Sequence, residues 1–478
     1  MTGRIKLERT SSSELQPHIH SGPLIKDLWS NASGSLEDYV RLGGYEVARR
    51  IAHMGTPDEA IRCLDDAGLR GRGGGGYPTA HKWWLVSQHE SPEKYFICNA
   101  NAGQAGGFKE RFLLTANPHR IVEAVITGAL TVDANVAFIA VPPQLSAETQ
   151  KIEAAVNDAR RHGFIGRDIF GTPNRLDVIV YKSLGSYIIG EETALLELIE
   201  GRVGRPRTKP PIPTARGLFG MPTIVNNLET VLQAHYILKV GAAEYRRVGT
   251  RRAPGTLIFS LSGHVKRPGL YELPLGTGLR ELIYEHGQGI MDERSLKAVF
   301  AGGISSPALG PESLDTNLDF DSMREIESDI GSGSVIVVAE GTCMVQVATQ
   351  LAEFFYYNSC GKCQPCKDGT QRTVVMLHNL ERLDEKSIDR SGKVLPQSLR
   401  KRTLNVLNNN PVAGVSYTDT VQGLEKIRHL CEFYKYRGDC HHSTEAANSI
   451  QSLLKRFRNE FEDHCLHSEC HHEGLVEV

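Results

Sequence analysis

Apolar residues follow two alternating patterns of spacing through the first half of the chain. Short continuous apolar runs, typical of buried strands, occupy residues 95–100, 137–141 and 177–182. Segments with the three-to-four-residue spacing of helices separate and follow these runs, at residues 119–132, 147–161 and 226–238. Strands that alternate with helices predict an α/β domain with a mostly parallel sheet, which we place at residues 35–245.

The pattern changes after Pro254. Residues 255–287 predict two strands around a turn, followed by one helix, so we interpret residues 246–335 as a small β-grasp-like module. The Ser-rich, polar residues 1–34 show no sustained periodicity and are interpreted as an N-terminal extension.

From Gly341 onward the pattern is almost wholly helical. We therefore predict a helical domain over residues 336–478, with a polar insertion near residues 383–416. The expected fold is multi-domain: an α/β domain, a small β-grasp-like module and an α-helical bundle.

Net charge and the length of the apolar runs limit the classes of protein to which the chain can belong. The 478 residues carry a formal net charge of −2, which gives no bulk electrostatic reason to expect a nucleic-acid partner. No apolar run approaches the ~20 residues of a membrane-spanning helix, and the first residues lack the apolar core of a secretory signal. We therefore expect a cytoplasmic protein, either free or docked to other subunits at the periphery of a membrane complex.

Three cysteines lie close together in the sequence Cys360-Gly-Lys-Cys363-Gln-Pro-Cys366. This C-x2-C-x2-C spacing lets three thiolates point into one concavity, which favours a 4Fe-4S cluster over the two separated pairs of a zinc site. A fourth ligand is required, and the candidates are Cys431 and Cys440, followed by Cys465 and Cys470. We favour Cys440, which begins a helix after a glycine, because the apolar spacing around Cys431 places it on a buried helix face.

The segment GLRGRGGGGYPTAHKW (residues 68–83) is the most glycine-dense part of the chain. Glycines let backbone amides approach a phosphate or a ring, and Arg72 and Lys82 supply positive charge nearby. Taken alone, the segment could equally be a flexible surface loop.

Six motifs change that interpretation. They are GLRGRGGGGYPTAHKW, CNANAGQAGGFKER, GSYIIGEETALLELIEG, KPPIP, GMPTIVNNLET and NSCGKCQPCKDGT. In this order they resemble the flavin-, nucleotide- and cluster-bearing subunit of respiratory complex I, a family that includes subunits of NAD-linked hydrogenases and formate dehydrogenases. The resemblance runs from about residue 40 to about residue 462.

The resemblance implies that FMN takes hydride from NADH and passes single electrons to the cluster. It implies a β-grasp domain of the soluble-ligand-binding type and supports Cys440 as the fourth ligand. It also implies two partners, a small subunit with a binuclear cluster and a larger iron–sulfur or catalytic subunit. The implied flavin contacts are Gly71, Arg72, Gly73, Lys82, Asn99, Tyr187, Gly190, Glu191, Glu192, Asn226 and Asn227.

The departures from the family pattern are concentrated where the dinucleotide is expected. Three acidic positions of the second glycine loop are Asn101, Ala102 and Gln104 here. Two aromatic positions that sandwich adenine are Leu85 and Ile212, although Tyr77 and Glu192 remain. Three hypotheses follow: an NADH-linked flavoprotein subunit, an electron-transfer module that has lost NADH use, and a flavin-free structural subunit.

The C-terminal residues form a second group of potential ligands. A zinc site and a polar helix end with incidental thiols both fit this pattern. The residues concerned are Cys465, His467, Cys470, His471 and His472, with His464, His441 and His442 as further candidates. The remaining cysteines, Cys63, Cys98 and Cys343, lie in apolar contexts and are interpreted as core residues.

Overall fold

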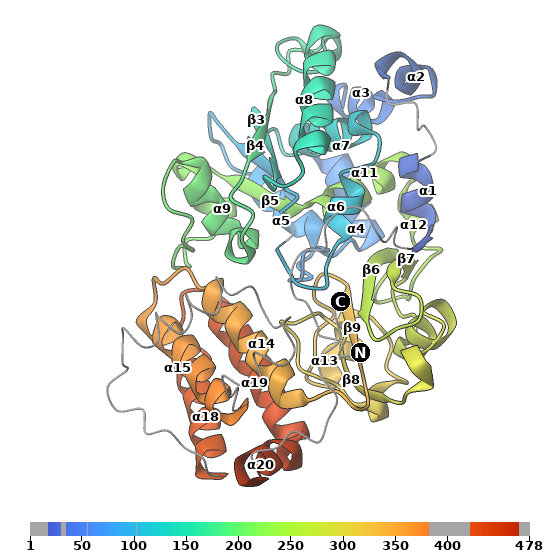
Figure 1. Ribbon diagram of the computed structural model, residues 1–478. Helices are drawn as coiled ribbons and strands as arrows, with labels where there is room; N and C mark the ends of the chain where they lie inside the picture. The colour runs from blue at the N-terminus through green and yellow to red at the C-terminus, as the bar shows by residue number, and fades with distance from the viewer. Residues whose placement is uncertain (1–17, 30–34, 55, 102, 382–420, 468–478) are drawn as a thin grey trace.

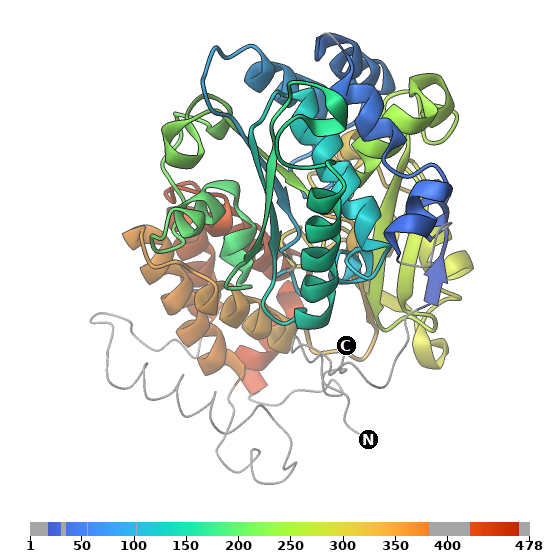
Figure 2. The ribbon, with the colours of Figure 1, turned by 90° about the horizontal axis from the view of Figure 1, so that it is seen from above.

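A computed structural model describes residues 18–29, 35–54, 56–101, 103–381 and 421–467. In these residues a parallel α/β unit packs against a second, mixed sheet and a group of C-terminal helices (Figure 1). Seen from above, the C-terminal helices and the second sheet lie on different sides of the α/β unit (Figure 2). The sequence therefore predicted correctly a mixed α/β chain of several units.

The first sheet has four parallel strands in the order β4-β3-β2-β5. Its strands are β2 (Tyr95–Asn99), β3 (Val136–Val141), β4 (Asp177–Lys182) and β5 (Thr223–Asn227). The longer helices of this unit are α4 (Asp58–Ala67), α5 (Thr79–Ser87), α7 (Pro118–Thr131), α8 (Ser146–Arg161), α9 (Glu192–Ile199) and α11 (Leu228–Val240). Shorter helices are α2 (Leu36–Arg41), α3 (Glu46–Ala52), α6 (Lys109–Leu113), α10 (Pro213–Arg216) and α12 (Ala242–Tyr245).

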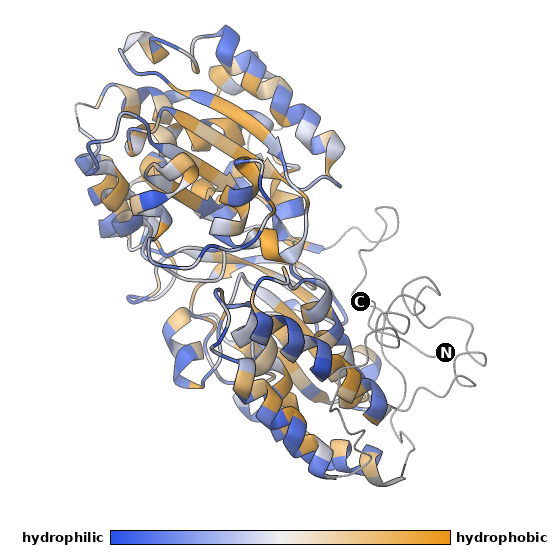
Figure 3. Cartoon of the chain, turned by 90° about the vertical axis from the view of Figure 1, so that its left-hand side faces the viewer, coloured by the Kyte–Doolittle hydropathy of each residue, from blue (hydrophilic) through white to orange (hydrophobic). Residues whose placement is uncertain are grey.

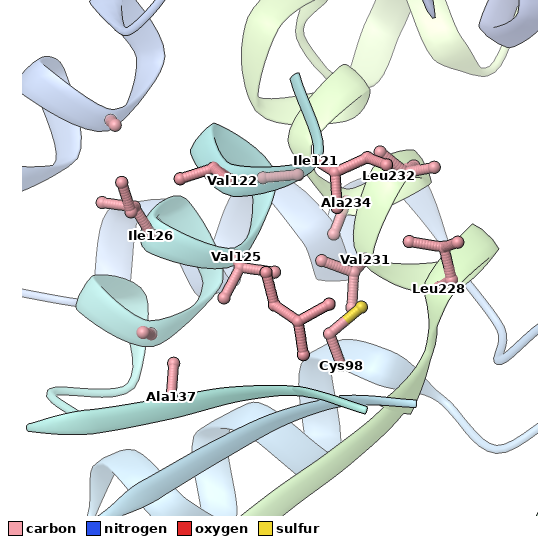
Figure 4. Close-up of a cluster of buried hydrophobic side chains, with 14 of the residues drawn as sticks. Cys98, Ile121, Val122, Val125, Ile126, Ala137, Leu228, Val231, Leu232 and Ala234 are labelled. Atoms are coloured by element: carbon pink, nitrogen blue, oxygen red, sulfur yellow. The ribbon is translucent and has the colours of Figure 1, made fainter. Parts of the chain in front are cut away.

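Alternate side chains of the central strand β2 point to opposite faces of this sheet. Phe96 and Cys98 pack with the apolar residues of α7 and α11, and Cys98 points between these two helices in Figure 4. Tyr95 and Ile97 pack with α9 on the opposite face. Because both faces of β2 are covered, all five of its residues are buried. Figure 3 shows the apolar character of this sheet in orange.

The second sheet has five strands in the order β1-β7-β6-β9-β8. Their bounds are β1 (His18–His20), β6 (Thr256–Gly263), β7 (Gly269–Pro274), β8 (Leu296–Phe300) and β9 (Ser334–Ala339). The predicted hairpin corresponds to β6 and β7, which are antiparallel. The predicted helix is one irregular stretch at Glu281–His286, and the strands after it were not predicted.

Part of the predicted N-terminal extension belongs to this second sheet. Strand β1 pairs in parallel with β7, and α1 (Pro23–Trp29) follows it. The Glu272 carboxylate in β7 accepts hydrogen bonds from the Leu24 and Ile25 amides at the start of α1. Three apolar side chains of α1 are buried, a pattern too brief to stand out in the sequence.

The C-terminal region is helical. Its helices are α14 (Met344–Tyr357), α15 (Gln364–Glu381), α18 (Val421–Tyr434), α19 (His442–Arg456) and α20 (Arg458–His467). They carry apolar inward faces and polar outward faces, visible as orange and blue stripes in Figure 3. The predicted polar insertion near 383–416 lies outside the described residues. Among the described helices, none is both long and apolar enough to cross a membrane.

Candidate functional site

The carboxyl edge of the parallel sheet carries three of the predicted flavin contacts. Asn99 ends β2 and Asn227 ends β5, and these two residues are register partners. Asn226 precedes Asn227 and is paired with Cys98. The chain runs from β2 to β3 on one side and returns to β5 on the other, so β2 and β5 flank the topological switch point, where open α/β sheets bind ligands.

The first glycine loop lies over this switch point. A Cβ atom added to Gly73 would approach Asn227 Cβ to 2.9 Å, so the loop touches the end of β5 directly. A Cβ atom added to Gly75 or Gly190 would meet nothing within 4 Å, which shows open space beside both backbones. Bare backbone facing open space at a switch point fits a flat ring and a phosphate, and therefore fits FMN.

Two lysines and two glutamates form a charged network beside the loop. Lys82 Nζ contacts Glu192 Oε2 at 2.9 Å and donates to the Val225 carbonyl at 2.8 Å. Lys209 Nζ contacts Glu191 Oε1 at 3.0 Å and Glu192 Oε1 at 2.8 Å. Burial of Glu192 favours a raised pKa, but the two lysine charges outweigh burial and lower the pKa to about 2. Glu192 is therefore ionised at neutral pH.

Glu192→Gln is expected to remove a pH dependence of stability. The folded-state pKa lies below the ordinary value of 4.5, so Glu192 stabilises the fold above pH 4.5 and this contribution is lost as the pH falls toward 2. Its upper bound is about 3 kcal/mol, because each pKa unit corresponds to about 1.4 kcal/mol. Thermal unfolding across this range should show a steeper loss of melting temperature in the wild type, and parallel curves would contradict the assignment.

Several predicted contact residues also hold one another in place. Asn99 Nδ2 donates to the Gly190 carbonyl at 3.2 Å, and Asn226 Oδ1 accepts from Trp83 Nε1 at 2.8 Å. Asn227 Oδ1 caps α11 by accepting from the Glu229 amide at 2.9 Å. Asn227 therefore has a structural role as a helix cap in addition to its predicted flavin contact. Their geometry is fixed by the protein before any ligand arrives.

Glu110 is a site residue that the sequence reasoning missed. Its Oε1 accepts from Asn227 Nδ2 at 2.9 Å, and the side chain is buried. Its place directly after the second glycine loop, in the segment Phe108-Lys109-Glu110, is the signal that could have identified it.

Arg72 differs from the expectation that its charge faces the flavin phosphate. The side chain is 1% exposed, and Nη2 donates to the Tyr245 hydroxyl at 3.1 Å and to the Pro254 carbonyl at 3.4 Å. Its guanidinium therefore joins the α/β unit to the start of the second sheet. Lys82 and Lys209 are the cations beside the sheet edge.

Four cysteines surround one small cavity below the sheet edge. Cys360, Cys363, Cys366 and Cys440 line it together with Ile188, Gly438, His442 and Ser443. Cys363 Sγ accepts a hydrogen bond from the Asp439 amide at 3.2 Å, which is the kind of contact that stabilises cluster sulfurs.

The other candidate for the fourth ligand lies apart from this cavity. Cys431 is fully buried in the helical core, with Sγ 3.5 Å from the Tyr434 hydroxyl, and it does not line the cavity. The structure therefore places Cys440, and not Cys431, with the C-x2-C-x2-C triplet.

Burial favours the protonated thiol at two of the cavity cysteines when no metal is bound. It raises the pKa of Cys366 to about 11 and that of Cys440 to about 12. Iron must therefore displace protons from these thiols, which couples cluster binding to pH.

A short turn joins the cysteine cavity to the sheet edge. In η2 (Tyr187–Gly190) the Ile188 side chain lines the cavity, and the Gly190 carbonyl accepts from Asn99. The Tyr187 ring packs against Phe354 of α14 and His442 of α19. This one turn therefore contacts both candidate cofactor sites.

The second glycine loop uses its polar side chains within the protein. Asn101 Nδ2 donates to Asn99 Oδ1 at 2.9 Å. Gln104 Nε2 donates to the Gly302 carbonyl at 3.0 Å, and Gln104 Oε1 accepts from Ser332 at 2.6 Å. The loop is thus attached to the second sheet by an uncharged side chain, and Ala102 lies outside the described residues.

The expected adenine positions remain accessible. Ile212 is 45% exposed and Tyr77 is 50% exposed, whereas Leu85 is half-buried. One aromatic face and two aliphatic side chains are therefore the groups this region offers to a base.

The C-terminal cysteine and histidine residues are only partly described. His464 and Cys465 are buried, and His464 Nε2 lies 3.4 Å from Cys343 Sγ. The His467 side chain and residues Cys470, His471 and His472 lie outside the described part, so the zinc site and the polar helix end with incidental thiols both stay hypotheses. His441 is exposed and precedes α19 as its N-cap.

Fold and site together define a flavin- and iron–sulfur-binding electron-transfer protein. Residues 64–236 match the model of the Nuo51 FMN-binding domain, and residues 346–404 and 414–464 match the NADH-ubiquinone oxidoreductase-F iron-sulfur binding region. Residues 258–303 match the SLBB domain. The cofactors predicted from the sequence, FMN and a 4Fe-4S cluster, are confirmed by these matches.

Whole-chain comparisons identify the family. An NADH-quinone oxidoreductase F subunit of Rhizobium meliloti is 36% identical over 91% of this chain and 95% of its own length. The F subunit of the Escherichia coli NADH-quinone oxidoreductase is 34% identical over 89% of both chains. A chain of the NAD⁺-reducing [NiFe]-hydrogenase aligns with a TM-score of 0.74 and 30% identity, covering 93% of this chain and 67% of that one. The chain belongs to the family of NADH-quinone oxidoreductase F subunits, as its motifs predicted.

Proposed function

We propose that this chain exchanges hydride with a nicotinamide dinucleotide through bound FMN and delivers the electrons singly to partner subunits through a 4Fe-4S cluster. The observation that carries the proposal is the η2 turn, which joins the Asn99 edge of the sheet to the four-cysteine cavity. Bound FMN supplies the conversion between two-electron hydride chemistry and one-electron transfer. The protein supplies the positions of the two groups.

Each residue set has a definite part in this proposal. Lys82 offers its charge to the FMN phosphate, and Asn226 and Asn227 orient the ribityl chain by hydrogen bonds. The backbone of Gly71, Arg72 and Gly73, with Asn99, Tyr187, Gly190, Glu191 and Glu192, completes the cradle. The cluster ligands are Cys360, Cys363, Cys366 and Cys440.

The domain and partner assignments belong to the same proposal. We divide the chain into an extension (1–34), a flavin domain (35–245), a β-grasp-like module (246–335) and a helical cluster domain (336–478). Because the relatives are named as subunits of oxidoreductases and hydrogenases, we expect partner subunits. A small binuclear-cluster subunit and a larger iron–sulfur or catalytic subunit are the proposed ones, and the cytoplasmic location stays a prediction.

A second candidate is an electron-transfer subunit that exchanges electrons with another donor. The observation that favours it is the uncharged second glycine loop, in which Gln104 is engaged by Gly302 and Ser332. Titrating the FMN-loaded protein with NADH separates the two candidates. Prompt bleaching of the flavin absorbance at micromolar NADH supports the first. Bleaching by dithionite but not by NADH supports the second, and absence of flavin would support a structural subunit.

Restoring aromatic side chains should strengthen nucleotide binding. The double variant Leu85→Phe, Ile212→Phe offers two further ring faces to adenine, each worth about 0.5–1.5 kcal/mol. The KM for NADH should therefore fall by roughly five- to 100-fold in ferricyanide assays. Leu42→Phe, at an exposed position that follows α2 as its C-cap, should leave KM unchanged. An unchanged KM in the double variant would show that adenine does not lie at these positions.

A further inference from the structure

A carboxylate from the cluster-bearing helices reaches the turn between the two cofactor sites. Glu445 in α19 accepts a hydrogen bond from the Tyr187 hydroxyl, with an oxygen–oxygen distance of 2.9 Å. The Tyr187 amide in turn donates to Asn358 Oδ1 at 3.2 Å. The pair therefore links α19 to the turn that adjoins both the sheet edge and the cysteine cavity.

Three parts of the molecule meet at this pair. A Cβ atom added to Gly103 of the second glycine loop would lie 2.6 Å from Tyr187 Cα, so that loop rests on the turn. Gln104 in the same loop donates to Ser305 at 3.2 Å, and Ser449 of α19 donates to the Ile304 carbonyl at 2.6 Å. Glu445 thus brings a carboxyl group to the place where the second glycine loop carries uncharged residues.

The surroundings of Glu445 favour its protonated form. Burial raises the pKa of Glu445, and the nearby Asp329 carboxylate adds to this, whereas the Tyr187 hydroxyl partly opposes it. His442, from the same helix, faces the Tyr187 ring with ring centroids 6.0 Å apart. Burial lowers the pKa of His442, which keeps this neighbour neutral. Cys440, a proposed cluster ligand, also lies near Tyr187.

We propose that Glu445 is a redox-linked proton acceptor for the bound flavin, positioned through Tyr187. When reduction adds negative charge to the flavin, Glu445 takes one proton from solvent, because the added charge disfavours a nearby carboxylate. When the electrons leave through the cluster, Glu445 returns that proton to solvent. The carboxyl O–H bond forms as an O–H bond of a solvent hydronium ion breaks, the reverse occurs on release, and the electrons stay on the cofactors. The inference rests on the proposed function, since it requires FMN beside Tyr187.

The pH dependence of the flavin midpoint potential tests this role. Spectroscopic redox titrations of the FMN-loaded protein should show a potential that falls with pH more steeply in the wild type than in Glu445→Gln, by up to one proton per reduction. Tyr187→Phe should move the steep region to higher pH, because it removes the hydrogen bond that favours the carboxylate. Glu432→Gln, on the exposed face of α18, is the matched control and should behave as the wild type.

The outcomes separate the inference from the function on which it rests. Wild-type protein that binds no FMN overturns the proposed function and this inference together. FMN-loaded wild type and Glu445→Gln with superimposable potential–pH curves overturn the inference alone. An altered slope in Glu432→Gln of the same size also overturns it, because the effect would then reflect net charge. A Tyr187→Phe curve identical to the wild type shows that Tyr187 does not position the carboxylate and overturns that part.

Discussion

Cys440→Ala is expected to abolish stable binding of the iron–sulfur cluster, whereas Cys431→Ala is expected to retain it. Cys440 lines the same cavity as Cys360, Cys363 and Cys366, and Cys431 does not. A cubane bound by three thiolates has one iron without a protein ligand, which makes it labile. Iron content and the broad visible absorbance of the cluster, which underlies the FMN bands, should therefore fall to near background in Cys440→Ala.

Cys431→Ala is a matched control because both residues are cysteines of the same helical region. Cys431 is completely buried, so its truncation leaves a small cavity and lowers stability by about 1 kcal/mol without affecting the metal. Cluster loss in Cys431→Ala, with retention in Cys440→Ala, would reassign the fourth ligand. FMN content should remain unchanged in both variants, because the flavin site is built on the parallel sheet.

Lys109→Met is expected to lower the free energy of unfolding by about 3–5 kcal/mol, because it leaves a buried glutamate without its cation. Lys109 Nζ lies 2.7 Å from Glu229 Oε2, and the two side chains are 1% and 0% exposed. The same ammonium donates to the Arg72 carbonyl at 2.8 Å, and Glu229 Oε1 accepts from the Ile258 amide of β6 at 3.0 Å. The Lys109–Glu229 ion pair therefore contacts both the first glycine loop, through Arg72, and the second sheet, through Ile258.

Urea denaturation followed by tryptophan fluorescence, to which buried Trp83 contributes, measures this change. Lys182→Ala is the matched control, because its ion pair with Glu153 is 3.1 Å long but exposed. Exposed pairs contribute at most about 1 kcal/mol, so this variant should unfold close to the wild type. Equal decreases of the unfolding free energy in Lys109→Met and Lys182→Ala would show that the buried Lys109–Glu229 pair contributes no more than an exposed pair. Weaker FMN retention in Lys109→Met is a second expected result.

Local spacing was sufficient to predict the ligand types and the bounds of β2, β3 and β4 to within one residue, but it missed β5, whose last residues Asn226 and Asn227 were expected to begin a helix. The three close cysteines and the residues Asn99 and Asn227 carry their chemistry in short segments, and parallel strands place their carboxyl ends at one edge. The direction of a long side chain depends instead on distant residues. The Arg72 guanidinium is held by Tyr245 and Pro254, which are 173 and 182 positions away in the chain, and no local pattern indicates this.

The same reason explains the residues that were missed. Glu445 and Glu110 look like ordinary polar positions of amphipathic helices, and their importance comes from tertiary contacts with Tyr187 and Asn227. Strand β1 has three residues, too few for periodicity, and exists because the edge of β7 is available. Sequence patterns thus predicted the cofactors better than the groups that surround them.

The N-terminal strand and helix have a consequence for synthesis on the ribosome. Leu24 and its acceptor Glu272 are separated by 248 positions in the chain, which at 5–20 residues per second corresponds to roughly 12–50 s of translation. During this interval the apolar side chains Leu24, Ile25 and Leu28 have no completed sheet on which to pack. The nascent chain therefore exposes an apolar segment. This segment is buried only after more than half of the polypeptide has emerged from the ribosome.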